Sequence, residues 1–159
     1  MEIWKVIAVF AVLAIAIGAA KAYTDSDTIT AQVTVPAICT VSLSTNSIDF
    51  GSVAPGSDTG STNQQVTVTN GGNTQAINTT IKGDDWSDGG TNTFAVGNTE
   101  WSTSAFTYGS GTSLTSSDAV ISGGNLAKGA SLTLYFGAGV PSGQNSASYT
   151  QTITITMNC

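Results

Sequence analysis

Few side chains of this chain are suited to acid–base or nucleophilic catalysis. The 159 residues include no histidine and no arginine, and the formal net charge is −6. Without histidine, neither a Ser–His–Asp triad nor a Cys–His pair can be built. Without arginine there are no guanidinium forks or basic stripe for nucleic acid to bind. We therefore expect neither an enzyme nor a nucleic-acid-binding protein, and we assign no cofactor.

The densest group of carboxylates is Asp84, Asp85 and Asp88, which flank Trp86 and precede two glycines. Carboxylate oxygens are ligands that Ca²⁺ accepts, so this group is a candidate cation site. Its spacing does not match the alternating acidic positions of an EF-hand loop. A solvated turn is the preferred interpretation, and no metal site is assigned.

The two cysteines, Cys39 and Cys159, are better suited to a disulfide than to a metal site. Two thiolates alone cannot complete a tetrahedral zinc site, and there is no histidine to supplement them. In an exported chain this pair predicts a disulfide that closes a loop of more than about a hundred residues, which stabilises by about 4–5 kcal/mol.

Aromatic residues gather in one short stretch, at Trp86, Phe94, Trp101, Phe106 and Tyr108. Exposed rings could form a platform on which sugars stack. Burial in a core or a subunit interface is the preferred interpretation, because rings bury a large area at low entropy cost.

A single N-glycosylation sequon is present, Asn78-Thr79-Thr80. It falls within a predicted strand, and a motif this short also arises by chance, so both readings stay open. Asn78 is the candidate glycosylation site.

The N-terminus is an apolar run. Residues 6–20 contain no polar side chain, which predicts a hydrophobic helix over residues 1–23 and a separate domain over residues 24–159. The run fits a cleaved signal peptide, since Ala20-Lys21-Ala22 is a small-x-small site. It equally fits a retained helix, about 30 Å long, that spans a bilayer or lines a filament core. Either use places the remainder outside the cell.

Beyond the apolar run, the hydrophobic pattern has a period of two. Ile29, Ala31, Val33 and Val35 alternate with polar residues, which predicts a strand over residues 28–35. Further predicted strands, separated by Gly- and Asn-rich turns, cover residues 39–43, 47–50, 65–69, 76–81, 93–96, 105–108, 119–121, 132–136 and 152–157. Many short strands at this spacing predict an all-β sandwich of seven to nine strands, with no helix longer than about two turns after Tyr23.

Several stretches resemble known surface proteins. Residues 47–57 and 66–73 are similar to the opening of immunoglobulin-like modules, and residues 132–136, 140–143 and 149–155 to their last two strands. Residues 34–42 resemble secreted pilus subunits of the spore-coat and chaperone-usher type. An apolar helix ahead of a β domain resembles type IV pilins, particularly the archaeal kind. These resemblances cover about half of the β region and imply an immunoglobulin-like fold. Residues 82–111 match nothing recognisable.

An exported β domain without catalytic groups must act by contact, which predicts a pilin-like structural subunit of an extracellular homopolymeric filament. Only 9% of its residues are charged, so its surface is mainly hydroxyl and amide. Assembly could use the apolar helix as a filament core or donate a strand to a neighbour. The residues expected at these contacts are Val6, Val9, Leu13, Ile17, Ile29, Ala31, Val33 and Val35. The alternative is a membrane-tethered adhesin or carbohydrate-binding module that recognises host or surface glycans.

Overall fold

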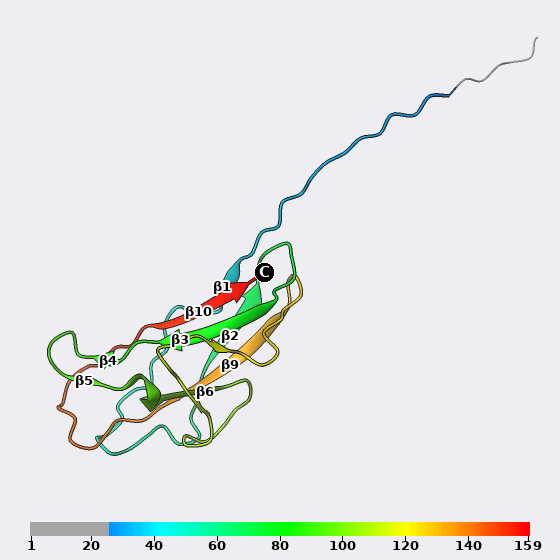
Figure 1. Ribbon diagram of the computed structural model, residues 1–159. Helices are drawn as coiled ribbons and strands as arrows, with labels where there is room; N and C mark the ends of the chain where they lie inside the picture. The colour runs from blue at the N-terminus through cyan, green and yellow to red at the C-terminus, as the bar shows by residue number, and fades with distance from the viewer. Residues whose placement is uncertain (1–25) are drawn as a thin grey trace, which may run out of the picture. The chain divides into compact units, whose positions relative to one another are not determined.

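The computed structural model describes residues 26–159 of the chain (Figure 1). Residues Pro36–Cys159 form one compact unit, and the described residues before it lie outside that unit. The sequence-based boundary, at residue 24, precedes the start of this unit. The predicted N-terminal helix falls outside the described residues, as do Val6, Val9, Leu13 and Ile17.

The described part of the chain is almost entirely β. It contains ten strands, against the seven to nine expected, and one short 3₁₀ turn, η1, at Val96–Asn98. Within residues 26–159, no helix is long and apolar enough to cross a bilayer. The strands are β1 (Val41–Leu43), β2 (Gln64–Asn70), β3 (Asn78–Gly83), β4 (Trp86–Ser87), β5 (Thr93–Phe94), β6 (Thr99–Ser102), β7 (Thr112–Ser113), β8 (Ala119–Val120), β9 (Ser131–Ala138) and β10 (Ile153–Asn158).

The strands form three antiparallel sheets. The largest has the order β1-β2-β9-β6-β7, the second the order β10-β3-β8, and β4 pairs with β5 in a short ribbon. In Figure 1, β3 and β10 run alongside each other, and β2 and β9 form the centre of the larger sheet. Strands adjacent in sequence are mostly not adjacent in a sheet, so the topology depends on long-range pairing.

The alternating sequence of the long strands explains which face is buried. In β2, Val66 and Val68 are buried while Gln65 is exposed, and Val66 lies opposite Leu134 of β9. Ile81 of β3 and Met157 of β10 come from the other sheet and join the same hydrophobic cluster. The two larger sheets therefore share one core, whose packing stabilises both.

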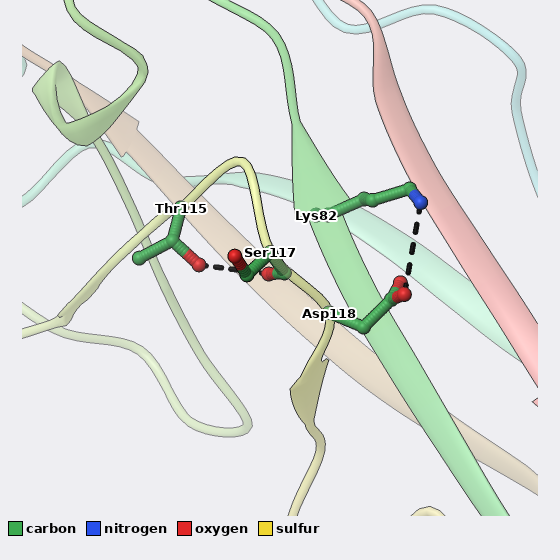
Figure 2. Close-up of polar contacts among 4 residues, drawn as sticks. All are labelled: Lys82, Thr115, Ser117 and Asp118. Atoms are coloured by element: carbon green, nitrogen blue, oxygen red, sulfur yellow. Dashed lines mark hydrogen bonds and ion pairs between the residues drawn. The ribbon is translucent and has the colours of Figure 1, made fainter.

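An ion pair and a turn lie at the surface beside the second sheet, β10-β3-β8 (Figure 2). Lys82 of β3 lies 3.6 Å from the carboxylate of Asp118, and the Thr115 hydroxyl donates to the carbonyl oxygen of Ser117 at 2.8 Å. Both charged side chains are largely exposed, so this pair contributes about 1 kcal/mol at most.

The strand predicted over residues 28–35 is not formed; this prediction was wrong for the isolated chain. Residues 26–40 carry no strand and none of them pairs with another strand. A period of two describes the two faces of an extended segment, but a strand also needs a neighbour for its backbone hydrogen bonds. The described part of this chain supplies no such neighbour.

Two more predicted strands are loops, and three short strands were not anticipated. Residues 47–50 lead into a turn in which the N–H of Gly51 donates to Asp49 at 2.8 Å. Residues 105–108 are held by loop contacts, such as the Phe106 N–H to the Asn63 side chain at 2.9 Å. Strands β4, β6 and β7 were missed. Strand β6 has three consecutive buried residues, including Glu100, and so lacks the alternation of a half-buried strand.

Candidate functional site

Two members of the acidic group, Asp85 and Asp88, use their carboxylates to accept hydrogen bonds from nearby loop residues. The carboxylate of Asp88 accepts the N–H groups of Gly90 and Asn92 and the side-chain amide of Asn92. These bonds, led by the Asn92 amide, lower the pKa of Asp88 below its ordinary value. Asp85 accepts the N–H of Val96 at 2.8 Å. Within residues 26–159, no three acidic, histidine or cysteine side chains gather as a metal site.

Two of the five predicted aromatic residues, Trp86 and Phe94, belong to one ring cluster. Trp86 stacks on Phe94, with ring centroids 5.4 Å apart, and Phe50 and Tyr149 meet this pair edge-on. Neither Phe50 nor Tyr149 was expected there, because both are distant in sequence and carry no local signal. Trp101 is buried in the core. For Phe94 and Trp101 the preferred interpretation, burial, is confirmed.

Glu100 is a buried carboxylate that holds a loop. Only 8% of its surface is exposed, and its Oε2 atom accepts the N–H groups of Gly109 and Gly111 at 2.8 and 3.0 Å. The neighbouring Tyr108 donates its hydroxyl to the Asn98 carbonyl oxygen at 3.3 Å. Burial, followed by the negative charges of Glu100 and Asp58, raises the pKa of Tyr108. The arrangement is structural, because both carboxylate bonds go to backbone of the same loop.

One concave surface is a groove that reaches the hydrophobic core, which we call the core groove. It encloses about 290 Å³ and its floor includes the buried side chains of Val66 and Phe136. No charged side chain lines it. Its apolar walls come from Leu43, Ile48, Phe50, Ile153 and Ile155. An uncharged groove open to the core is suited to apolar side chains supplied from outside.

Polar hydrogen bonds fix one end of the core groove. Thr99 is fully buried, accepts the indole N–H of Trp86 at 3.0 Å and donates to the Gln151 side chain at 2.7 Å. Gln151 in turn donates to the Asp84 carbonyl oxygen at 2.8 Å. Because these groups satisfy one another, this end of the groove is rigid and well defined.

The predicted disulfide is formed. Cys39 and Cys159 are bonded, with Cα atoms 5.8 Å apart, which confirms the pairing. The bond joins the residues just outside β1 and β10, the strands that end the two larger sheets, and Figure 1 shows these strands side by side. Within the described residues, β10 pairs as a strand only with β3, and the Cys39 sulfur lies 3.3 Å from the carbonyl oxygen of Met157 in β10.

The start of the compact unit is tied down beside this disulfide. The side chain of Asn73 accepts the N–H of Ile38 at 2.7 Å and donates to the Pro36 carbonyl oxygen at 2.9 Å. A β-carbon at Gly72 would lie 2.2 Å from the Ile38 oxygen, so only glycine fits there. The fully buried Asn70 supports this turn by accepting the Gly72 N–H at 2.9 Å.

The predicted assembly residues ahead of the unit are uncovered. Ile29 is 96% exposed, Val33 85% and Val35 73%, and Ala31 is exposed as well. We call residues 28–35 the apolar segment. One face of this segment is aliphatic, and in the single chain that face lies in solvent.

The sequon residue Asn78 is the first residue of β3. It is partly exposed, and its side-chain oxygen accepts the Asn158 amide at 2.8 Å. Glycosylation there stays a prediction.

Comparison of the sequence with protein-family models and with curated proteins finds no match. The likeness to pilus subunits therefore stays a prediction, and the functional argument rests on the core groove and the apolar segment.

Proposed function

We propose that this chain is the structural subunit of an extracellular, homopolymeric filament, built on an immunoglobulin-like β-sandwich. The observation that carries the proposal is the exposure of Ile29, Val33 and Val35 on one face of an extended segment. Exposed aliphatic side chains beside unpaired backbone favour association with another chain. In a polymer, every subunit except the last has another chain to cover these side chains.

Two assembly routes agree with this proposal. In one, apolar N-terminal helices carrying Val6, Val9, Leu13 and Ile17 pack together in a filament core. In the other, the apolar segment completes the sheet of a neighbouring subunit. Either contact joins different surfaces of two copies, and such head-to-tail contacts propagate rather than close.

The proposed location is the cell exterior. Before assembly, or through its N-terminal helix, the subunit is associated with the membrane. A disulfide between Cys39 and Cys159 is compatible with that location, because such bonds persist in oxidising surroundings. The work of the subunit is contact rather than catalysis, without cofactor or nucleic acid.

A membrane-tethered adhesin that binds glycans is the second candidate. It is favoured by a second groove of about 600 Å³, beside the rings of Trp86, Phe94 and Tyr149. However, the amides at this groove bond within the protein: Gln144 donates to the Thr93 carbonyl oxygen and Asn145 to the Asn92 side chain. Groups already paired are poor partners for sugar hydroxyls, so the filament is preferred.

Shearing of cells that export the protein separates the two candidates. A filament subunit leaves the cells as polymer that sediments and is seen by electron microscopy, whereas a tethered adhesin leaves only with detergent. Loss of residues 1–35 is expected to abolish the sedimenting polymer. Intact exported protein that stays monomeric at high concentration would contradict the proposal.

A further inference from the structure

We propose that Asn70-Gly71 is a site of spontaneous deamidation in the unfolded chain, that the native fold blocks this reaction, and that a chain modified there no longer closes its disulfide. Deamidation and disulfide formation therefore compete for each newly made chain. The inference goes beyond the proposed function and does not depend on it.

Asn70-Gly71 is the only Asn-Gly pair in the sequence, and this pair is chemically labile. Glycine has no β-carbon, so in a flexible chain its backbone nitrogen can approach the side-chain carbonyl carbon of the preceding asparagine. A bond forms between the Gly71 nitrogen and that carbon, the bond to the side-chain nitrogen breaks, and ammonia leaves with the Gly71 amide proton. Water, the only co-reactant, then opens the cyclic imide and leaves an aspartate or an isoaspartate at position 70.

The native structure engages both nitrogen atoms of this reaction. The Gly71 N–H donates to the Thr40 carbonyl oxygen at 2.9 Å, so the attacking nitrogen is occupied. The side-chain nitrogen of Asn70, the leaving group, donates to the carbonyl oxygens of Thr74 and Leu126 at 2.8 and 3.0 Å. Asn70 is also fully buried, away from water. Deamidation therefore requires that this part of the fold first opens.

An acidic side chain does not fit where Asn70 lies. A carboxylate there would be fully buried and would face the two carbonyl oxygens that now accept the amide, neither of which can donate a hydrogen bond. An isoaspartate also lengthens the backbone by a methylene group just before Gly72, where even a β-carbon would lie 2.2 Å from the Ile38 oxygen. Both products are strongly unfavourable in the native structure, because one buries an unpaired charge and the other also displaces closely packed backbone.

The turn of residues 70–73 positions Cys39 for the disulfide. The residue before Cys39, Ile38, accepts the Asn73 N–H at 3.0 Å and donates its own N–H to the Asn73 side chain at 2.7 Å. The residue after Cys39 accepts the Gly71 N–H. Cys39 is thus held from both sides by this turn, and a distorted turn leaves its thiol away from the partner cysteine.

The two glycines of the turn differ in what the fold requires of them. A β-carbon at Gly72 collides with the backbone of Ile38, whereas one at Gly71 meets only ordinary contacts, the nearest 3.7 Å away on the Thr40 side chain. The φ angle of Gly71 is not positive either. Alanine at position 71 is therefore compatible with the native structure, although its β-carbon hinders the approach of its nitrogen in the unfolded chain. Gly71→Ala separates the chemistry from the fold.

The protection is tested by incubating the full-length protein at one mildly alkaline pH, native and oxidised in one sample, reduced and unfolded in guanidinium chloride in the other. Peptide mapping by mass spectrometry then locates each converted asparagine. In the unfolded sample we expect Asn70 to be converted first. In the native sample we expect Asn70 to react at least about a hundredfold more slowly, because only the rare opened state can react. The exposed Asn46 and Asn145, each followed by serine, should be converted before it.

The effect on the disulfide is tested by returning the aged, unfolded protein to oxidising buffer without denaturant. We expect chains converted at Asn70 to be depleted at least about tenfold among those that carry the Cys39–Cys159 bond. The matched variant, Gly71→Ala, aged and refolded in the same way, should keep the yield of freshly unfolded protein. The depletion is measured in the unchanged protein, so it tests the proposal without any variant.

Each step can be overturned separately. Conversion of Asn46 or Asn145 before Asn70 in the unfolded chain would refute the site, and equal rates at Asn70 in both samples would refute the protection. Modified chains that form the disulfide as readily as unmodified chains would refute the competition. Gly71→Ala protein that folds when fresh but loses its yield as fast as the unchanged protein would refute it as well.

Discussion

The disulfide provides the most direct test of how this fold is stabilised. Cys39 and Cys159 are 120 residues apart in the sequence, so their bond closes nearly the whole compact unit into a loop. In the chain-entropy model, closing a loop of this length removes about 4.9 kcal/mol of unfolded-state freedom at 25 °C. Domains are typically stable by only about 5–15 kcal/mol, so replacement of both cysteines by serine should remove a large share of that stability.

The native fold itself should survive the substitution. The bonds from Asn73 to Pro36 and Ile38 hold the start of the domain without the disulfide, and Met157 remains packed in the core. The loss should therefore appear in unfolding equilibria rather than in the spectrum of the folded protein. With a denaturant dependence of about 2 kcal/mol per molar urea, the midpoint should fall by about 2.5 M.

The matched control is Lys82→Ala, which removes the exposed ion pair to Asp118 and should cost less than about 1 kcal/mol. A loss below about 1 kcal/mol in the double-serine variant would refute the loop-entropy reasoning. It would mean that the unfolded chain is already restricted by other means.

Three further changes test the interior. Glu100→Gln weakens the charge-assisted bonds to Gly109 and Gly111 and should cost about 1.5–3 kcal/mol in chemical denaturation, whereas no change would show that the charge is irrelevant. Asn70→Leu strands the buried backbone groups that Asn70 now pairs and should cost about 3 kcal/mol or more, and a neutral effect would contradict this account. Burial raises the pKa of Tyr108, so the protonated phenol stabilises the folded state. This contribution to stability is complete below the unfolded-state pKa of about 10 and is lost as the pH rises through the folded-state pKa. Tyr108→Phe should make alkaline unfolding less steep, and an unaltered pH profile would contradict the assignment.

The local hydrophobic pattern was sufficient to predict the position of long strands that have one buried and one exposed face. Strands β2, β9 and β10 lie close to their predicted positions, because Val66, Leu134 and Ile155 alternate with polar residues. The disulfide was also predictable from the sequence, since two cysteines in a chain with no histidine have few other uses. These inferences need only residue type and spacing.

Strand β6 shows where local pattern is insufficient. Thr99 and Glu100 are polar, yet both are buried. Trp86 and Gln151 complete the hydrogen bonds of Thr99, and the N–H groups of Gly109 and Gly111, from one loop, complete those of Glu100. Thr99 and Gln151 are 52 residues apart, so no short window of sequence contains both, and a buried polar strand resembles a loop until the chain is folded.

The same contrast between local pattern and long-range pairing applies to the apolar segment and the core groove. The sequence by itself determined that residues 28–35 have an aliphatic face, since alternation is a property of one stretch. Only the tertiary structure decided that this face has no partner within the described chain, and that Leu43, Val66, Phe136 and Ile155 converge on one open groove. The physical reason is that a groove is defined by side chains from separate strands, whose meeting depends on long-range sheet pairing that no local pattern encodes.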